Sequence, residues 1–339
     1  MMKGKRVKYS DIDSLVNGFL KGSNSIVFGF KKDGNTINHH IFKGSAKGLF
    51  LINPFFGANG ASYFRRLFQK GTEILFILRP CEIRAYIELT KLTQIEKEAI
   101  IAVSVDCPGT FSQKNYDESS ISLSSEDIKD YFHMDGKDIR WACHQCREKR
   151  GIVGDAGIRL DKEGGLWLVP YTEKGETLVS HIGGEIKELP EHMALAPGKQ
   201  PDSFKTDMDN LRKDLERCLL CKNCRDMCPV CYCIDCVFNG DEYLPKGDAL
   251  LNKILRTGSV EMPQGKELFH LIRMYHVSQT CIGCGGCEEA CPQNIPLTKY
   301  FKGVSERLQG IFSYMAGKSF DEPIPYTTFL EDELKDAAD

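Results

Sequence analysis

Hydrophobic residues recur at helical spacing in segment 9–22. Ile12, Val16 and Phe19 lie on one face, and Ser10 with Asp13 three residues later is typical of a helix start. Segments 25–32, 37–42 and 48–53 are short and rich in residues that favour strands, and turn residues separate them. We therefore expect one amphipathic helix followed by short strands.

The pattern then changes to buried strands followed by helices. Segment 73–78 is an apolar run, and Pro80 suits the first turn of a helix that extends to about Leu92. Segment 99–105 repeats the apolar run, and segments 157–160 and 166–171 predict more sheet. Strands that alternate with helices indicate an α/β first domain with its chemistry at strand ends.

The rest of the chain has a different pattern. Segment 108–142 is polar and predicts a surface excursion with a short helix near 126–132, and the proline-containing stretch 197–201 predicts a linker. Segments 204–217, 248–255, 266–277 and 297–308 then predict helices. We expect an α/β domain at 1–196, a mainly α-helical domain at 197–312, and an extended tail at 313–339 that covers a surface or a partner.

Composition limits the class of protein. A chain of 339 residues with 42% hydrophobic and 27% charged residues predicts a soluble globular protein of two or three domains. The net charge of −3 gives no reason to expect nucleic acid or an anionic membrane as a partner. We find no apolar run near the roughly 20 residues of a membrane span, so we expect no direct membrane insertion.

Cysteine usage predicts the compartment. The fifteen cysteines stand at metal-ligand spacings, and the polar N-terminal segment is unlike a secretory signal. We therefore expect a protein of a reducing cytoplasm, in an anaerobe.

Two cysteine runs carry the same spacing, C-x2-C-x2-C-x3-C-P. This is the signature of a ferredoxin with two 4Fe-4S clusters, in which the fourth cysteine of each run ligates the other cluster. Zinc is the competing interpretation of paired C-x2-C, but it does not explain the third and fourth cysteines or the prolines. The 52 residues between the runs favour a helical ferredoxin over the compact β-rich kind. The predicted ligands are Cys218, Cys221, Cys224 and Cys291 for one cluster, and Cys281, Cys284, Cys287 and Cys228 for the other.

Four cysteines stand outside these runs. Cys81 and Cys107 each follow a predicted strand, and Cys143 and Cys146 form a further C-x2-C pair. A third 4Fe-4S cluster would use all four thiols. Buried structural cysteines are common in protein cores, so the residues alone leave both interpretations open.

Three more cysteines, Cys231, Cys233 and Cys236, follow the first ferredoxin run. Soft thiolates this close together favour a metal, either in a fourth centre with a ligand from elsewhere or in a rewired cluster that includes Cys228. Rewiring would leave the second ferredoxin cluster one ligand short. Buried structural thiols are the remaining alternative.

A glycine-containing loop runs from a predicted strand into a helix between residues 56 and 67. Backbone N–H groups of Gly57, Asn59, Gly60 and Ser62 at a helix start suit a phosphate group, and Arg65 is close enough in sequence to assist. The loop lacks the G-x-G-x-x-G pattern, so a tight turn with no ligand is the alternative.

The cysteines outside the ferredoxin runs stand in phrases that resemble the beta subunits of the coenzyme F420-reducing hydrogenase and formate dehydrogenase family. These phrases are P-C-E-I-R-A from Pro80, D-C at Cys107, C-H-Q-C from Cys143 and G-D-A-G from Gly154. The resemblance covers about 45–190, and segment 205–310 is similar to the helical ferredoxin component of heterodisulfide reductase. Leu78 stands where the family commonly has glycine.

The resemblance implies cofactors and a function. In such proteins the four cysteines hold a cluster beside FAD, and Asp155, nine residues after Cys146, belongs to the flavin region. It implies an iron–sulfur flavoprotein subunit that transfers electrons between a hydride carrier, F420 or NAD(P)H, and a partner hydrogenase, formate dehydrogenase or heterodisulfide reductase. The alternative is a non-catalytic subunit with three clusters and no flavin. No catalytic acid or base is identifiable from the sequence.

Overall fold

The computed structural model describes residues 2–34, 36–67, 71–115, 139–195, 207–239, 247–259 and 265–329. The predicted helix near 126–132, the predicted linker at 197–201 and the acidic end from 330 onward lie outside these ranges.

A mixed sheet forms the centre of the first module. Within the described residues it has nine strands, with β4 paired to β2 beside the order β11-β1-β10-β9-β7-β6-β2-β3. The neighbours β2, β6, β7 and β9 are parallel, and the outer pairs are antiparallel. The bounds are β1 Lys3–Val7, β2 Ser25–Asp33, β3 Thr36–Phe42, β4 Leu49–Phe50, β6 Glu73–Leu78, β7 Ile100–Val105, β9 Ala156–Leu160, β10 Leu166–Pro170 and β11 Lys187–Glu188.

The first helix begins at the predicted residue but has a different cap. Helix α1 (Tyr9–Phe19) follows Lys8, whose backbone N–H donates to Asp11 Oδ2 at 2.7 Å. The predicted capping pair Ser10 and Asp13 is therefore wrong, because the acid that caps the helix is Asp11. The sequence does not predict strand β1, because its residues Lys-Gly-Lys-Arg-Val are mostly charged and lack the alternation of apolar and polar residues; its backbone pairs with β10.

Helix α3 (Pro80–Lys91) lies at the centre of the molecule and is buried on several faces. It follows β6 directly, as the apolar run and Pro80 predict. Its Tyr86 ring contacts Phe320 edge-on at 5.6 Å between centroids. The remaining elements of this module are α2 (Ala61–Leu67), α5 (Trp141–His144), α6 (Glu173–Ser180), the 3-10 helix η1 (Gln113–Asn115), and the pair β5 (Phe55–Phe56) and β8 (Phe111–Ser112).

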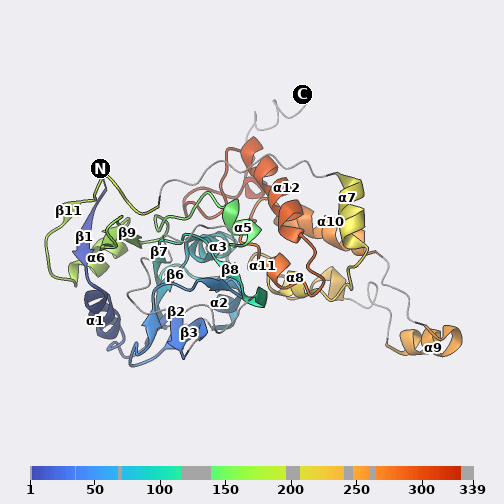
Figure 1. Cartoon of the computed structure of the whole chain (residues 1–339), viewed down its shortest axis with the longest axis horizontal. Coiled ribbons are helices and arrows are strands. Elements are labelled where there is room, and N and C mark those ends of the chain that lie inside the picture. The colour runs from blue at the N-terminus through green and yellow to red at the C-terminus, as the bar shows by residue number, and fades with distance from the viewer. Residues whose placement is uncertain are drawn as a thin grey trace.

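The elements described between residues 207 and 311 are helices, gathered on the other side of the molecule (Figure 1). Helix α10 contacts α7 and α12, and α11 contacts α8 and α12, around a core that includes Phe269, Tyr300 and Phe301. Helix α9 stands apart from the others in Figure 1. The bounds are α7 Met208–Leu215, α8 Asn223–Asp226, η2 Val237–Asn239, α9 Gly247–Thr257, α10 Lys266–Val277, α11 Gly286–Glu289 and α12 Leu297–Ile311.

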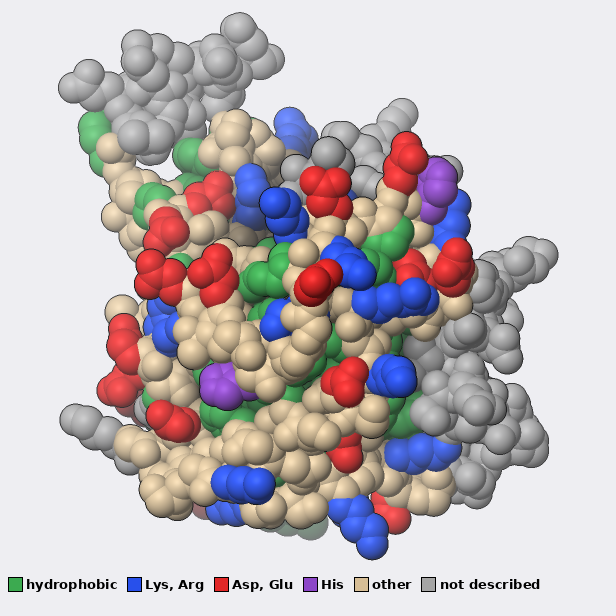
Figure 2. Space-filling view, turned by 90° about the vertical axis from the view of Figure 1, so that its left-hand side faces the viewer, with side chains coloured by type: hydrophobic (Ala, Val, Ile, Leu, Met, Phe, Trp, Pro, Cys, Tyr) green, Lys and Arg blue, Asp and Glu red, His purple; other side chains and the backbone are tan. Residues whose placement is uncertain are grey.

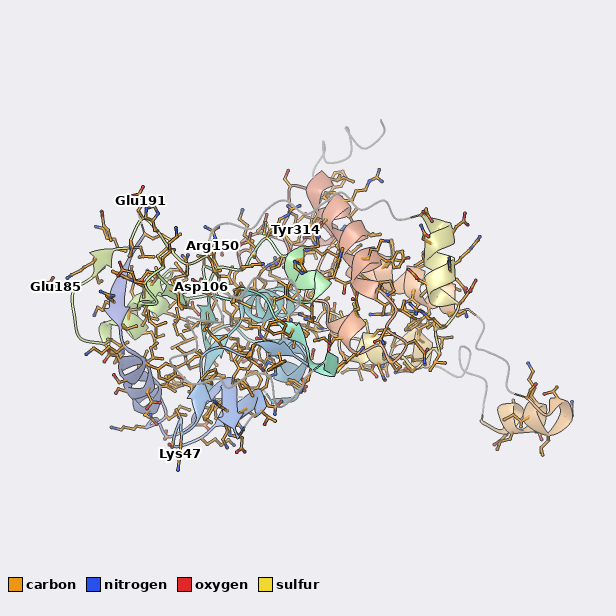
Figure 3. All side chains as sticks on the ribbon, viewed as in Figure 1. Lys47, Asp106, Arg150, Glu185, Glu191 and Tyr314 are labelled. Atoms are coloured by element: carbon orange, nitrogen blue, oxygen red, sulfur yellow. The ribbon has the colours of Figure 1, made fainter. Side chains whose placement is uncertain are left out.

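The segment after α12 returns to the first module. Residues 313–329 lack α-helices and strands and include the 3-10 helix η3 (Pro325–Thr327). Tyr314, which is labelled in Figure 3, is buried with Ala316 and Ile324 in the same core as the sheet. This part of the predicted tail thus covers a surface of its own chain, that of α3.

The molecular surface carries charges of both signs. Figure 2 shows the face at the β11–β1 end of the sheet, where Lys and Arg side chains are interspersed with Asp and Glu. In the part of the chain that the structure describes, no helix combines the length and the apolar character that crossing a membrane requires.

Candidate iron–sulfur centres and the adjoining cavity

The two ferredoxin runs have the same backbone shape. Leu220 and Gly283, each before the second cysteine of its run, have positive φ of 52° and 69°. Lys222 and Gly285, each after that cysteine, have φ of 64° and 74°, and α8 or α11 begins next. A left-handed conformation is unfavourable for leucine and lysine, so it persists only where the surroundings fix it. Both runs therefore have the same local backbone conformation around their second cysteine.

The thiols of the first predicted set lie together. Burial raises the pKa of Cys224 to about 11; Arg273 opposes the rise, and the thiols of Cys218, Cys291 and Cys221 add to it. Cys291 comes from the second run, so the structure brings together the four thiols that the crossed ferredoxin pattern predicts.

The second predicted set is also brought together. Burial raises the pKa of Cys228 well above its ordinary value, and the neighbouring thiols of Cys231, Cys281 and Cys287 add to the rise. The thiol of Cys284 in turn has Cys281 as a neighbour.

The four cysteines outside the runs converge as well. Strands β6 and β7 are parallel neighbours, so Cys81 and Cys107, which follow them, emerge at the same sheet edge. Burial raises the pKa of Cys107 to about 12; Arg79 opposes this, and the thiols of Cys143 and Cys146 add to it.

Two side chains connect this third set to the second. Arg140 Nη2 donates to Cys143 Sγ at 3.5 Å and to the backbone oxygen of Cys284 at 3.1 Å. The buried Asn59 donates from Nδ2 to the backbone oxygen of Cys81 at 3.4 Å, and its side chain also hydrogen-bonds to Cys284. The third and second thiol sets are therefore adjacent.

A single zinc ion and an iron–sulfur cube require different arrangements of cysteine thiols. All fifteen cysteines are free of disulfides. Within the described ranges, no three Cys, His, Asp or Glu side chains are grouped closely enough to hold one metal ion. A structural zinc site draws four ligands to about 2.3 Å from one ion, whereas a cube spreads its thiolates over four corners.

Cys231, Cys233 and Cys236 lie beside the second set and line a cavity of about 670 Å³. Cys233 is exposed, and the other two are partly buried. Arg273 hydrogen-bonds to Cys231, and Arg225 hydrogen-bonds to Cys236. These thiols therefore have cations as neighbours, although they are not grouped as ligands of one ion.

A second cavity, of about 630 Å³, has residues of both modules in its wall, including Met227, which directly precedes Cys228. Its wall includes His39, whose Nε2 donates to Glu82 Oε1 at 2.6 Å, and Glu82 directly follows Cys81. Burial raises the pKa of Glu82, but Arg79 and His39 outweigh it and hold that pKa at about 2. The carboxylate is thus ionised. The residues that line the cavity are Phe28, Asn38, His39, His40, Ile41, Asn53, Gly57, Ala58, Tyr63, Gln113 and Met227.

The predicted phosphate loop lies at this cavity, and side chains of other segments lie close to its glycines. A Cβ on Gly57 would lie 2.2 Å from Gln113 Oε1, and one on Gly60 would lie 3.0 Å from His39 Nε2. However, the Gly60 N–H donates to Glu82 Oε1 at 2.9 Å, and the Ala61 N–H donates to Asn59 Oδ1 at 3.0 Å. Two amides of the loop therefore already have partners within the protein.

The other predicted flavin contacts have different surroundings. Ser62 Oγ donates to the backbone oxygen of Met227 at 3.2 Å and so connects α2 to the second module. The Arg65 side chain lies outside the described part. Asp155 accepts from the Ala102 N–H at 2.8 Å and from Thr172 Oγ1 at 2.7 Å, which gives its carboxylate a structural role between β7 and α6.

Sequence reasoning missed His39, Glu82, Arg140 and Arg273. Glu82 had a signal, since an acid three residues after Arg79 is typical of a first helical turn. The others come from distant segments, so no local pattern predicts their contacts with the thiol sets.

Comparisons with known proteins give relatives for both modules. A family model described as a 4Fe-4S dicluster domain matches residues 214–295. The beta subunit of F420-dependent formate dehydrogenase from Methanocaldococcus jannaschii is 25% identical over an alignment of 286 residues, and the match covers 70% of this chain and 72% of the relative. The beta subunit of F420-dependent formate dehydrogenase 1 from Methanococcus maripaludis is 25% identical over 308 residues, 76% of each chain.

A solved structure also matches, from the F420-reducing [NiFe] hydrogenase complex of Methanosarcina barkeri studied by xenon derivatization. It covers 62% of this chain and 85% of the matched chain at 15% identity, with a TM-score of 0.38. The two curated relatives and the family model confirm the resemblance seen in the cysteine phrases, and they support an iron–sulfur electron-transfer subunit of an oxidoreductase. The chain is a homologue of F420-dependent formate dehydrogenase beta subunits that carries a 4Fe-4S dicluster domain at residues 214–295.

Proposed function

We propose that this chain is an iron–sulfur flavoprotein subunit of an anaerobic redox complex. It transfers electrons between a hydride carrier, by way of FAD, and a partner oxidoreductase, by way of three 4Fe-4S clusters. The observation that carries the proposal is the adjacency of the thiol sets: Asn59 and Arg140 link the third set to the second, and Arg273 lies near the first and the second. A cavity with Met227, next to Cys228, in its wall lies beside them. The relatives favour F420 over NAD(P)H as the carrier, because both are F420-dependent formate dehydrogenase subunits.

The cavity beside His39 suits the flavin. Its volume of about 630 Å³ lies within the usual range for ligand pockets, and Phe28, His39 and Tyr63 give it aromatic walls. Bound FAD would accept two electrons as a hydride and release them singly, which one-electron clusters require. In this role Glu82 fixes the His39 ring, and the absence of Cβ atoms at Gly57 and Gly60 leaves room beside Gln113 and His39.

Fixed cations support the cluster assignment. A 4Fe-4S cube with four thiolates is an anion, and a buried anion requires positive neighbours. Arg140 contacts Cys143, and Arg273 contacts Cys224. The helices of the second module also agree with the proposed similarity to the ferredoxin component of heterodisulfide reductase.

One observation favours the alternative of a three-cluster subunit without flavin. The Gly60 amide, one of those predicted to bind a flavin phosphate, donates to Glu82, and the neighbouring Ala61 amide donates to Asn59. A carboxylate at that position also repels a phosphate. Under this alternative, electrons enter and leave through partner subunits only.

The deciding experiment uses full-length protein purified without oxygen. We expect about twelve iron and twelve sulfide ions per chain, four of each for three cubes, and FAD in an acid extract. Full iron without FAD supports the three-cluster alternative, and zinc without iron excludes both functions.

The third cluster is tested by changing Cys143→Ser together with Cys146→Ser. This variant should lose about four iron ions per chain and keep the two ferredoxin signals. His144→Ala is the matched control, because His144 is an exposed residue between the two cysteines. Unchanged iron in the double variant contradicts the third site.

A further inference from the structure

Arg273 is a buried cation held in a fixed position in the second module. Its side chain extends from α10 and is 2% exposed. Nη1 donates to Cys224 Sγ at 3.1 Å, and Nη2 donates to the Cys224 backbone oxygen at 3.0 Å. The rings of Phe269 and Phe301 lie 5.4 and 4.8 Å from its Cζ atom. Hydrogen bonds and aromatic contacts together fix the guanidinium group.

Thiols of both ferredoxin sets surround this charge. Burial lowers the pKa of Arg273, but the thiolates of Cys224, Cys228, Cys231 and Cys287 outweigh burial and raise it. Cys224 belongs to the first predicted set, and Cys228 and Cys287 belong to the second. Arg273 therefore lies within electrostatic reach of both sets.

Few other charges balance Arg273. Among the described residues, no Asp or Glu forms an ion pair with it. A buried, unpaired cation is strongly unfavourable, so the partner of this charge is the negative charge of the thiolate sets.

The position of the Arg273 charge affects how readily a neighbouring cluster would accept an electron. A cube with four thiolates becomes more negative by one charge when it accepts an electron. A fixed cation in a poorly solvated site attracts the reduced form more than the oxidised form. We propose that Arg273 is a positioning residue whose charge raises the reduction potentials of both ferredoxin clusters together. This inference rests on the proposed function, because it requires those two clusters.

The test is a redox titration of the anaerobically purified full-length chain, followed by electron paramagnetic resonance. In Arg273→Met we expect the reduction potentials of both ferredoxin clusters to fall. At a fixed applied potential, the ratio of reduced to oxidised cluster should be at least tenfold lower, which corresponds to a shift of about 59 mV for one electron. Arg273→Lys keeps the charge and loses the planar fork, so its potentials should lie nearer those of the unchanged protein. Arg212→Met is the matched control, because Arg212 is exposed on α7 and solvent screens its charge.

Each outcome has a separate meaning. Unchanged potentials in an iron-replete Arg273→Met protein overturn the proposal, and a shift of one signal alone overturns the shared effect. Absence of both clusters from the unchanged protein is instead a failure of the proposed function. If Arg273→Met loses iron, Arg273→Gln is titrated in its place. If Arg273→Met and Arg273→Gln lose iron but Arg273→Lys keeps it, the result supports a requirement for positive charge at this position. If all three variants lose iron, Arg273 has only a structural role and the proposal is overturned.

Discussion

Three cysteines after the first ferredoxin run are not part of the ferredoxin pattern, and arginine side chains lie beside two of them. Arg273 hydrogen-bonds to Cys231 and Arg225 to Cys236, while Cys233 is exposed. Cysteines that serve only as apolar core residues do not need such cations, because a neutral thiol carries no charge to balance. Burial nevertheless raises the pKa of Cys231, with Arg273 opposing the rise, and Arg225 also forms an ion pair with Asp226. The predicted metal centre of this group therefore stays a prediction.

The metal prediction for this group is tested by changing Cys231, Cys233 and Cys236 to Ser together. If the three thiolates hold a fourth centre, iron or zinc per chain should fall while the two ferredoxin signals remain, because those clusters have their own eight ligands. If Cys231 and its neighbours replace Cys228, one ferredoxin signal should disappear. The iron, zinc and sulfide contents and the electron paramagnetic resonance spectrum, compared with those of the unchanged protein, distinguish these results. If none of them changes, only the structural explanation remains.

Asn59 and Arg140 have a different role from the ligands. Each contacts one residue of the third thiol set and Cys284 of the second set. They thereby hold the two sets in register across the boundary between modules. Neither residue stands in a metal-ligand motif, so only the folded chain shows this connection.

At the scale of elements, the turn from β5 to α2 forms one wall of the proposed flavin cavity. A Cβ on Gly60 would approach His39 Nε2 to 3.0 Å and a ring carbon of Phe28 to 3.1 Å. We therefore expect Gly60→Val to displace the His39 ring and to weaken FAD binding by about tenfold or more, since a loss of 1.4 kcal/mol is tenfold in affinity. The measurement is FAD per folded chain and the dissociation constant of added FAD.

The control for this change is Gly18→Val, because a Cβ on Gly18 meets nothing within 4 Å and lies on α1. It should retain FAD as the unchanged protein does. Full FAD retention in a folded Gly60→Val protein would place the flavin away from this loop.

The sequence predicts a helix or strand accurately where a single residue pattern determines its type and its limits. Strand β6 and helix α3 match their predicted limits closely, because a buried parallel strand is apolar throughout and Pro80 fits only the first helical turn. Helix α10 matches for a similar reason, since one apolar face decides it. Strand β4 is shorter than predicted, as propensity alone does not decide which residues find a hydrogen-bonding neighbour.

The candidate site is only partly predictable for a related reason. Cysteine spacing predicts the thiol sets, because the geometry of a cube restricts how ligands are spaced along a chain. The cavity is different: its walls come from β2, β3, the loop before α2, Gln113 and Met227. No local pattern joins segments that lie so far apart in sequence.

At the scale of the whole molecule, the segment after α12 joins the two modules. Arg84 of α3 donates to the Ala316 backbone oxygen from Nε and Nη2, at 2.9 and 2.6 Å. Glu88 of α3 accepts from Tyr314 Oη and from the Gly317 N–H, both at 2.6 Å. The segment continues from α12 and is therefore held to α3 of the first module by buried hydrogen bonds.

These contacts predict that the two modules unfold together. Tyr314→Phe removes one hydrogen bond to the buried Glu88 carboxylate, and such bonds to charged groups contribute about 1.5–3 kcal/mol. Because the bond joins the modules, the loss should lower the thermal midpoint seen in the circular dichroism of the sheet and in the visible absorption of the clusters by the same amount. Tyr275→Phe is the control, since Tyr275 is 83% exposed and should leave both midpoints unchanged. If the two signals instead have separate midpoints, and Tyr314→Phe shifts only one of them, the modules are independent folding units and the segment is a tether rather than part of a shared core.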